Sequence, residues 1–167
     1  LKNEKALQIA YSKGVPMGSK LESSNNIPSF FIWAKRDPID APLEKIQIIK
    51  GWTENGDIHE KVMDIACSNG PVNEETGFCK KTDAVVDLNN CSISENIGSE
   101  EIKIQWSDLN YNQNQNAFYY IRVIQNPTCR WSTYDSLRIG KEAPKNFAST
   151  VNEMAWSSPI WISKNLQ

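Results

Sequence analysis

Hydrophobic and polar residues alternate with a period of two through most of the chain after residue 28. The clearest example is residues 101–107, where Ile102, Ile104 and Trp106 alternate with charged or polar residues, which predicts a half-buried strand. Further strands are predicted on the same grounds at residues 29–35, 43–52, 58–67, 82–88, 117–125 and 158–163. In residues 29–35 both faces carry large apolar side chains, so we expect both faces of that strand to be covered.

A hairpin is predicted between the runs at 43–52 and 58–67. The two runs are separated by a segment that contains Asn55 and Gly56. Asn-Gly between alternating runs is a strong hairpin signal, because both central residues of a type I′ turn need a positive φ.

About seven short strands with turns between them, and almost no helix, predict an all-β sandwich. We assign this sandwich domain to residues 29–167 and an N-terminal linker segment to residues 1–28. Helical spacing of apolar residues from Ala6 to Tyr11, followed by Gly14, predicts one short helix in the linker. The linker is expected to join an upstream domain.

Composition and charge narrow the functional classes. The formal net charge is -2 and the pI is about 5.5, without a large basic cluster, which argues against nucleic acid as a partner. No apolar run approaches the roughly 18–20 residues that span a bilayer, so membrane insertion is not expected. The first residues contain neither an initiator Met nor a signal-peptide core, which suggests a fragment or a processed form.

The four cysteines favour disulfides over a metal site. Cys67, Cys79, Cys91 and Cys129 are irregularly spaced, and His59 is the only histidine that could complete a zinc set. Cys67 and Cys79 bracket a short excursion between strands, which suggests a local bridge and leaves Cys91 to pair with Cys129. Free buried thiols are the alternative. Disulfides would place the chain in an oxidising compartment, periplasmic or extracellular.

Motifs for catalysis or cofactor binding are missing from the sequence, so we predict no catalytic residue, no metal ligand and no cofactor in this chain. Asp108, Asn110 and Asn112 have the spacing of a calcium loop, but the Gly and Glu that such a loop needs are replaced by Gln113 and Tyr119. A solvated hairpin loop is the favoured interpretation of this segment.

An unusual connection follows the run at 117–125. It contains Arg130, Trp131, Tyr134, Asp135 and Arg138, where Gly, Ser and Asn would be ordinary. One interpretation is a brace: Pro127 ends the strand, Cys129 anchors the loop, the aromatic rings cover the end of the sandwich and the arginines pair with Asp135 or with carbonyl groups. The other is an inter-domain or ligand loop, with Arg130 and Trp131 facing the upstream domain. The two interpretations are compatible.

Five segments carry a resemblance to a known family. They are GVPMGSKL, FFIWAKRDP, LEKIQIIKGW, AFYYIRVIQNPTCRWSTYD and AWSSPIWIS, which together extend from about Gly14 to Ser163. They resemble the C-terminal part of a large bacterial domain-of-unknown-function family. The upstream part of that family is similar to polymerase-and-histidinol-phosphatase-like metallohydrolases. The resemblance implies a divalent metal in the upstream part, which is the expected partner of this chain.

The end of the chain also resembles an immunoglobulin or fibronectin-III sandwich. In this resemblance Tyr119 is the corner tyrosine of the penultimate strand, Ile121 and Val123 point inward, and residues 158–160 open the last strand.

Two functions are therefore expected. The first is a non-catalytic module that packs on an upstream catalytic part and shapes it. The alternative is a carbohydrate- or small-ligand-binding module, suggested by six tryptophans and the Asn-rich loops. A coplanar exposed row formed by Trp33, Trp52, Trp131 and Trp161 would favour the alternative, and scattered burial would remove that argument for it.

Overall fold

Extended backbone dominates the part of the chain that the structure, a computed structural model, describes: residues 5–22, 26–142 and 145–163. Strands far outnumber helices in this part of the chain, which confirms the predicted all-β sandwich with a short N-terminal helix. The elements are α1 (Ala6–Lys13), β1 (Lys20–Glu22), β2 (Ser29–Lys35), β3 (Leu43–Glu54), β4 (Asp57–Cys67), β5 (Val86–Asp87), β6 (Ser92–Ile93), β7 (Glu101–Ser107), β8 (Asn116–Cys129), α2 (Trp131–Ile139), β9 (Thr150–Trp156) and β10 (Ile160–Ser163).

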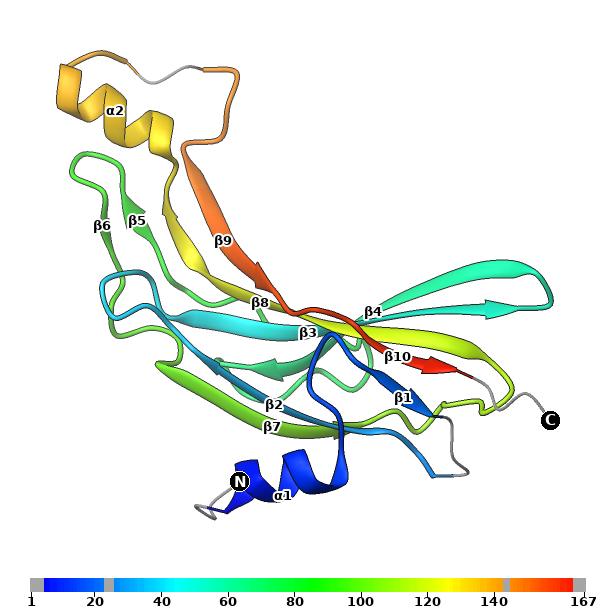
Figure 1. Ribbon diagram of the computed structural model, residues 1–167. Helices are drawn as coiled ribbons and strands as arrows, with labels where there is room; N and C mark the ends of the chain where they lie inside the picture. Colours follow the sequence, from blue (N-terminus) through cyan, green and yellow to red (C-terminus); the bar gives the residue numbers. More distant parts are fainter. Residues whose placement is uncertain (1–4, 23–25, 143–144, 164–167) are drawn as a thin grey trace.

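One layer of the sandwich is a six-stranded sheet in the order β1-β10-β8-β3-β4, with β9 paired to the far part of β8 (Figure 1). β3 lies between two antiparallel neighbours, β8 and β4, so both of its edges are paired. β1 belongs to residues 1–28 of the predicted division and pairs in parallel with β10. The boundary between linker and domain stays a prediction.

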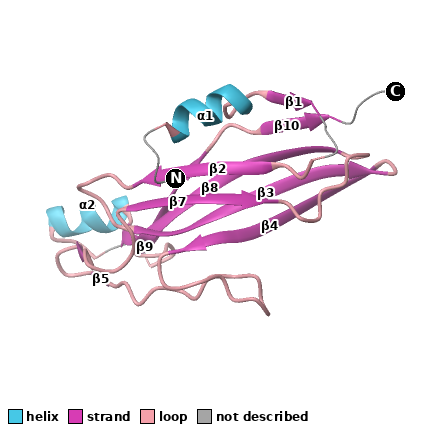
Figure 2. Cartoon of the chain, turned by 90° about the horizontal axis from the view of Figure 1, so that it is seen from below, coloured by secondary structure: helices cyan, strands magenta, loops and turns pink. Residues whose placement is uncertain are grey.

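The second layer is the antiparallel pair β2–β7 (Figure 2). Because side chains alternate along a strand, one face of each layer supplies the core. The buried core residues are Phe30, Ile32, Leu43, Ile46, Ile48, Ile65, Ile102, Ala117, Tyr119 and Ile162. Ile104, Trp106, Ile121 and Val123 pack against this cluster as the alternation predicted.

The predicted hairpin is present between β3 and β4. Asn55 has a φ of 54° and Gly56 a φ of 93°, and Glu54 pairs with Asp57 across the turn. The positive φ values are the reason that Asn and Gly occupy these positions.

Two strand predictions need correction. In β2 only one face is covered: Phe30 and Ile32 are buried, but Trp33 is half exposed. In residues 82–88 only Val86–Asp87 is a strand. The reason is that Thr82 is buried and its hydroxyl donates to Asn126 at 2.5 Å, which fixes the start of this segment by side-chain bonding and not by a sheet ladder.

The connection after residue 125 also differs from the prediction. Pro127 does not end the strand, because β8 continues to Cys129 and pairs with β9 across a register shift between Ile124 and Pro127. Such an irregularity is where a strand tolerates proline, which has no N–H to donate. The remainder contains the helix α2, which ends at Gly140 with a left-handed φ of 65°.

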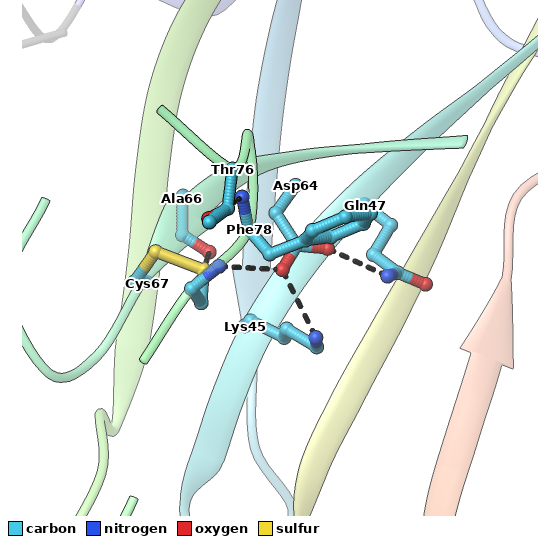
Figure 3. The surroundings of a disulfide bond; sticks show 8 residues. Lys45, Gln47, Asp64, Ala66, Cys67, Thr76 and Phe78 are labelled. Atoms are coloured by element: carbon cyan, nitrogen blue, oxygen red, sulfur yellow. Dashed lines mark hydrogen bonds and ion pairs between the residues drawn. A yellow bond between two sulfur atoms is a disulfide. The ribbon is translucent and has the colours of Figure 1, made fainter. Parts of the chain in front are cut away.

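Both disulfides have the predicted pairing, Cys67–Cys79 and Cys91–Cys129. The first holds the segment after β4 against the six-stranded sheet (Figure 3). There the Cys79 N–H donates to the Asp64 carboxylate at 2.8 Å, and Lys45 and Gln47 donate to the same carboxylate. Burial would raise the pKa of Asp64, but these three donors outweigh it and hold the pKa below its ordinary value.

Candidate functional site

A buried charged cluster lies at the end of the sandwich where the β3–β4 hairpin projects beyond the second layer. The Lys50 Nζ donates to Asp108 Oδ2 at 2.5 Å, and the Tyr119 hydroxyl donates to the same oxygen at 2.8 Å. The Lys50 and Asp108 side chains are only 7% and 4% exposed. Lys50 Nζ also lies over the rings of Trp52 and Tyr119, 5.3 and 5.6 Å from their centroids.

The cluster is built by three elements. Lys50 follows Ile46 and Ile48 on the inward face of β3, Tyr119 points inward from β8, and Asp108 comes directly after β7. The Asp108 N–H donates to the Pro28 carbonyl at 3.2 Å, so both strands of the second layer help to place the carboxylate. An ammonium and a carboxylate that share hydrogen bonds can be buried together.

The hydrogen bonds determine the protonation of the cluster. Burial would raise the pKa of Asp108, but the hydrogen bonds from Lys50 and Tyr119 and the charge of Lys50 hold it below its ordinary value. Burial and the neighbouring Asp108 carboxylate raise the pKa of Tyr119. At neutral pH the cluster therefore contains an Asp108 carboxylate and a neutral Tyr119 phenol.

A cavity of about 330 Å³ opens above this cluster. One wall is the inward face of the β3–β4 hairpin and the other is the loop formed by residues 108–115. The lining residues are Lys50, Trp52, Glu54, Lys61, Met63, Asp108, Asn110, Asn112 and Gln115.

The calcium-like spacing in this loop has another explanation. The Asp108 carboxylate accepts from Lys50 and Tyr119 with one oxygen and from the Asn110 N–H with the other, at 3.0 Å. The Lys50 ammonium thus supplies the positive charge next to Asp108. Within residues 5–22, 26–142 and 145–163, no group of three or more His, Cys, Asp or Glu is placed to hold a metal ion.

At the opposite end of the six-stranded sheet lies α2 (Figure 1). Its polarity is inverted: small polar residues are buried and large apolar ones are exposed. Trp131 keeps 70% of its surface exposed and Tyr134 38%, whereas Thr133 keeps 4% and Ser132 8%. A helix that belongs wholly to one domain normally turns its apolar side to the core.

The helix is held to the sandwich by polar contacts and one disulfide. The Arg130 N–H and the Thr133 hydroxyl both donate to the Ser149 carbonyl at 2.8 Å. Cys129, at the end of β8, is bonded to Cys91. The bracing interpretation therefore holds for Cys129.

The bracing interpretation is wrong for the aromatic and charged side chains. Trp131 and Tyr134 are exposed, so they do not cover the end of the sandwich. The Arg130 guanidinium lies over the Phe147 ring, 5.5 Å from its centroid. Arg130, Asp135 and Arg138 take part in none of the ion pairs between described residues.

The four tryptophans proposed to form a row lie on different elements. Trp33 lies on β2, Trp52 is half buried on β3, Trp131 begins α2 and Trp161 lies on β10. The Trp33 indole N–H donates to the Glu101 carboxylate, and the Lys103 Nζ lies over the Trp33 ring, 4.1 Å from its centroid. Trp161 packs on Phe118. They form no coplanar row.

Sequence reasoning missed the contributions of Lys50 and Gln115 to the cavity. The signal for Lys50 was present, because a lysine at an inward position of an apolar strand must find a buried counter-charge. Gln115 gave no such signal. It is buried through its hydrogen bond to Glu54, at 2.8 Å, which is a contact between segments far apart in sequence.

The fold and these two regions define a disulfide-braced β-sandwich module. Among the described residues, no helix is long and apolar enough to span a membrane. The chain belongs to the family described as "Protein of unknown function (DUF3604)", whose model matches residues 1–164. This confirms the predicted membership in a domain-of-unknown-function family. No curated protein and no solved structure matches the chain.

Proposed function

We propose that this chain is a non-catalytic β-sandwich module of an exported, metal-dependent hydrolase-like protein, and that α2 is the surface that packs on the catalytic part. The sandwich is assigned to the immunoglobulin or fibronectin-III type, with Tyr119 in the penultimate core strand. The divalent metal and its ligands belong to the upstream part of the parent protein.

The inverted polarity of α2 carries this proposal. Exposed Trp131 and Tyr134 cost free energy in water, and Leu137 and Ile139 on the same helix and Phe147 beyond it are also exposed. Aromatic residues beside an arginine are the composition of the buried centre of protein interfaces. Arg130 is also a cation suited to an anionic group at the edge of an active site.

Two further observations support the proposal. The chain has one histidine, and its buried carboxylates Asp64 and Asp108 form ion pairs with lysines. It therefore has few side chains that could serve as ligands of a catalytic metal. The two disulfides are compatible with a periplasmic or extracellular location.

Hydrogen exchange tests the docking surface. Amide exchange of residues 131–139 is measured in the isolated chain and in the parent protein. We expect strong additional protection in the parent, because its catalytic part would cover the helix. Residues 57–61 at the tip of the β3–β4 hairpin serve as the internal control and should exchange equally in both. Equal exchange of α2 in the two proteins would refute the docking surface.

Activity is tested separately. The chain and the parent protein are assayed with p-nitrophenyl phosphate in the presence of Mn²⁺ or Zn²⁺. We expect turnover by the parent alone, and metal-dependent turnover by the purified chain would contradict a non-catalytic role.

A further inference from the structure

We propose that the cavity between the β3–β4 hairpin and residues 108–115 binds a small uncharged polyhydroxyl molecule of monosaccharide size. This site is independent of the α2 surface, which lies at the opposite end of the six-stranded sheet (Figure 1). It also differs from the surface row of tryptophans considered from the sequence, because only Trp52 contributes to it.

The size and the walls of the cavity fit a small ligand. A volume of about 330 Å³ lies at the lower end of the roughly 300–1,000 Å³ typical of ligand pockets. Apolar surface comes from Trp52 and Met63, and the remaining lining side chains are polar or charged. A sugar ring has the matching character, with C–H groups on its faces and hydroxyl groups around its edge.

The charges in the lining favour a neutral ligand. Lys50 and Lys61 are balanced by Asp108 and Glu54, and Lys50 is already paired with Asp108. A charged ligand would meet an equal number of like charges, so it gains little net attraction. Neutral hydroxyl groups can bond to both signs, since a hydroxyl is a donor and an acceptor.

The lining of the cavity offers hydrogen-bond donors and acceptors to the hydroxyl groups of a ligand. An ammonium has three N–H donors, and among the described residues the hydrogen bonds of Lys50 Nζ use one of them, to Asp108. The side-chain amides of Asn110 and Asn112 lie at the exposed rim, where Asn110 offers both a donor and an acceptor and Asn112 offers its NH₂ donor. The buried Lys50 ammonium would bond a hydroxyl that enters the cavity.

The loop wall is already ordered without a ligand. The Asn112 side chain accepts from the Asn114 N–H at 3.0 Å, and the Gln115 N–H donates to the Asn112 carbonyl at 3.1 Å. The Gln115 side chain then ties the loop to Glu54 on β3. A preformed wall lowers the ordering cost of binding, which matters most for a weak, small ligand.

Titration of the ¹⁵N-labelled chain with glucose, galactose, mannose and N-acetylglucosamine tests the site. Each sugar is added to a concentration high enough to detect a dissociation constant of about 1 mM or weaker. We expect at least one sugar to shift the Trp52 indole N–H resonance and the Asn110 side-chain amide in a saturable way. Inorganic phosphate and calcium chloride are titrated in parallel and should leave both resonances unchanged.

Matched variants locate the binding. Trp52→Ala should weaken binding roughly tenfold or more, because most of the apolar surface that Trp52 contributes to the lining is lost. Asn110→Ala should weaken it several-fold, and its exposed side chain can be removed without disturbing the fold, so this variant decides the matter if Trp52→Ala is unstable. Trp161→Ala is the control, since this half-exposed tryptophan lies on β10, outside the lining.

Three results would overturn the proposal. The first is that no sugar gives a saturable shift. The second is that phosphate or calcium moves the same resonances while the sugars do not, which would mean an ionic site. The third is that Trp161→Ala weakens sugar binding as much as Asn110→Ala, which would place binding elsewhere.

Discussion

The two ends of the six-stranded sheet differ in which side chains they bury and which they expose. At the cavity end, charged groups are buried and find their partners within the chain, as Lys50, Asp108 and Tyr119 do. At the α2 end, apolar groups are exposed and small polar residues are buried beneath them. The polar groups of the cavity end are satisfied within the chain, whereas the exposed apolar side chains of the α2 end are the basis of the proposed docking surface.

The two ends also differ in how they are held. A disulfide and backbone hydrogen bonds fix α2, whose buried side chains are too small to supply much hydrophobic energy. The cavity end depends on one ion pair and its hydrogen bonds. Reductant and acid should therefore loosen different ends of the same molecule.

Removing the disulfide at the α2 end should have the largest effect. Cys91 and Cys129 are separated by 38 residues, and closing a loop of that length is worth about 4 kcal/mol by chain entropy. We expect the double variant Cys91→Ser/Cys129→Ser to lose about that much free energy of unfolding, measured by urea denaturation.

The second disulfide is the matched control. Cys67 and Cys79 are only 12 residues apart, so Cys67→Ser/Cys79→Ser should lose about 3 kcal/mol. A greater loss for the shorter loop would show that α2 is not held mainly by its covalent bond.

Breaking the ion pair should have the next largest effect. Asp108→Asn leaves the Lys50 ammonium buried without a counter-charge, which we expect to cost about 3 kcal/mol of unfolding free energy. The double variant Lys50→Met/Asp108→Asn removes both charges and should regain much of that loss. Equal stability of the single and double variants would mean that a Lys50 ammonium without its counter-charge carries no penalty at this position.

Acid should act on the cavity end before it acts on the α2 end. The folded-state pKa of Asp108 is lowered, so its contribution is fully present above the unfolded pKa of about 4 and is lost as pH falls through the folded value. Hydrogen exchange of residues 108–119 should rise below pH 4 before that of residues 131–139, and added reductant at neutral pH should reverse the order. Asp64→Asn is a useful control, since its lowered pKa predicts the same pH window at the Cys67–Cys79 bridge.

The sequence was sufficient for the parts of the fold that alternate strictly. The inward residues of β7 and the Asn55-Gly56 turn follow from local pattern and backbone preference. Residues 82–88 were misread because their apolar residues alternate, although Thr82 is held by a side-chain bond to Asn126 on a distant strand. Local periodicity contains no information about such a partner.

The same limit applies to the two candidate surfaces. The sequence identified Trp131 and Tyr134, but it did not reveal that they belong to a helix, because the periodicity of α2 is reversed with respect to the core. The cavity could be suspected from Lys50 at an inward position and from the Asn-rich loop. Whether Lys50 and this loop lie side by side depends on how the end of β7 is placed against the β3–β4 hairpin, which is a property of the tertiary fold.

The smallest expected effect tests the inversion of α2 directly. Trp131→Gln and Tyr134→Gln should each change the unfolding free energy of the isolated chain by no more than about 0.5 kcal/mol, because both side chains are exposed. Thr133→Val keeps the shape of a buried side chain but removes its hydrogen bond to the Ser149 carbonyl, so it should cost about 1 kcal/mol. Urea denaturation of the three variants makes the comparison. If the exposed aromatic residues prove the more costly to replace, they pack on this chain in solution, and α2 is a brace and not a docking surface.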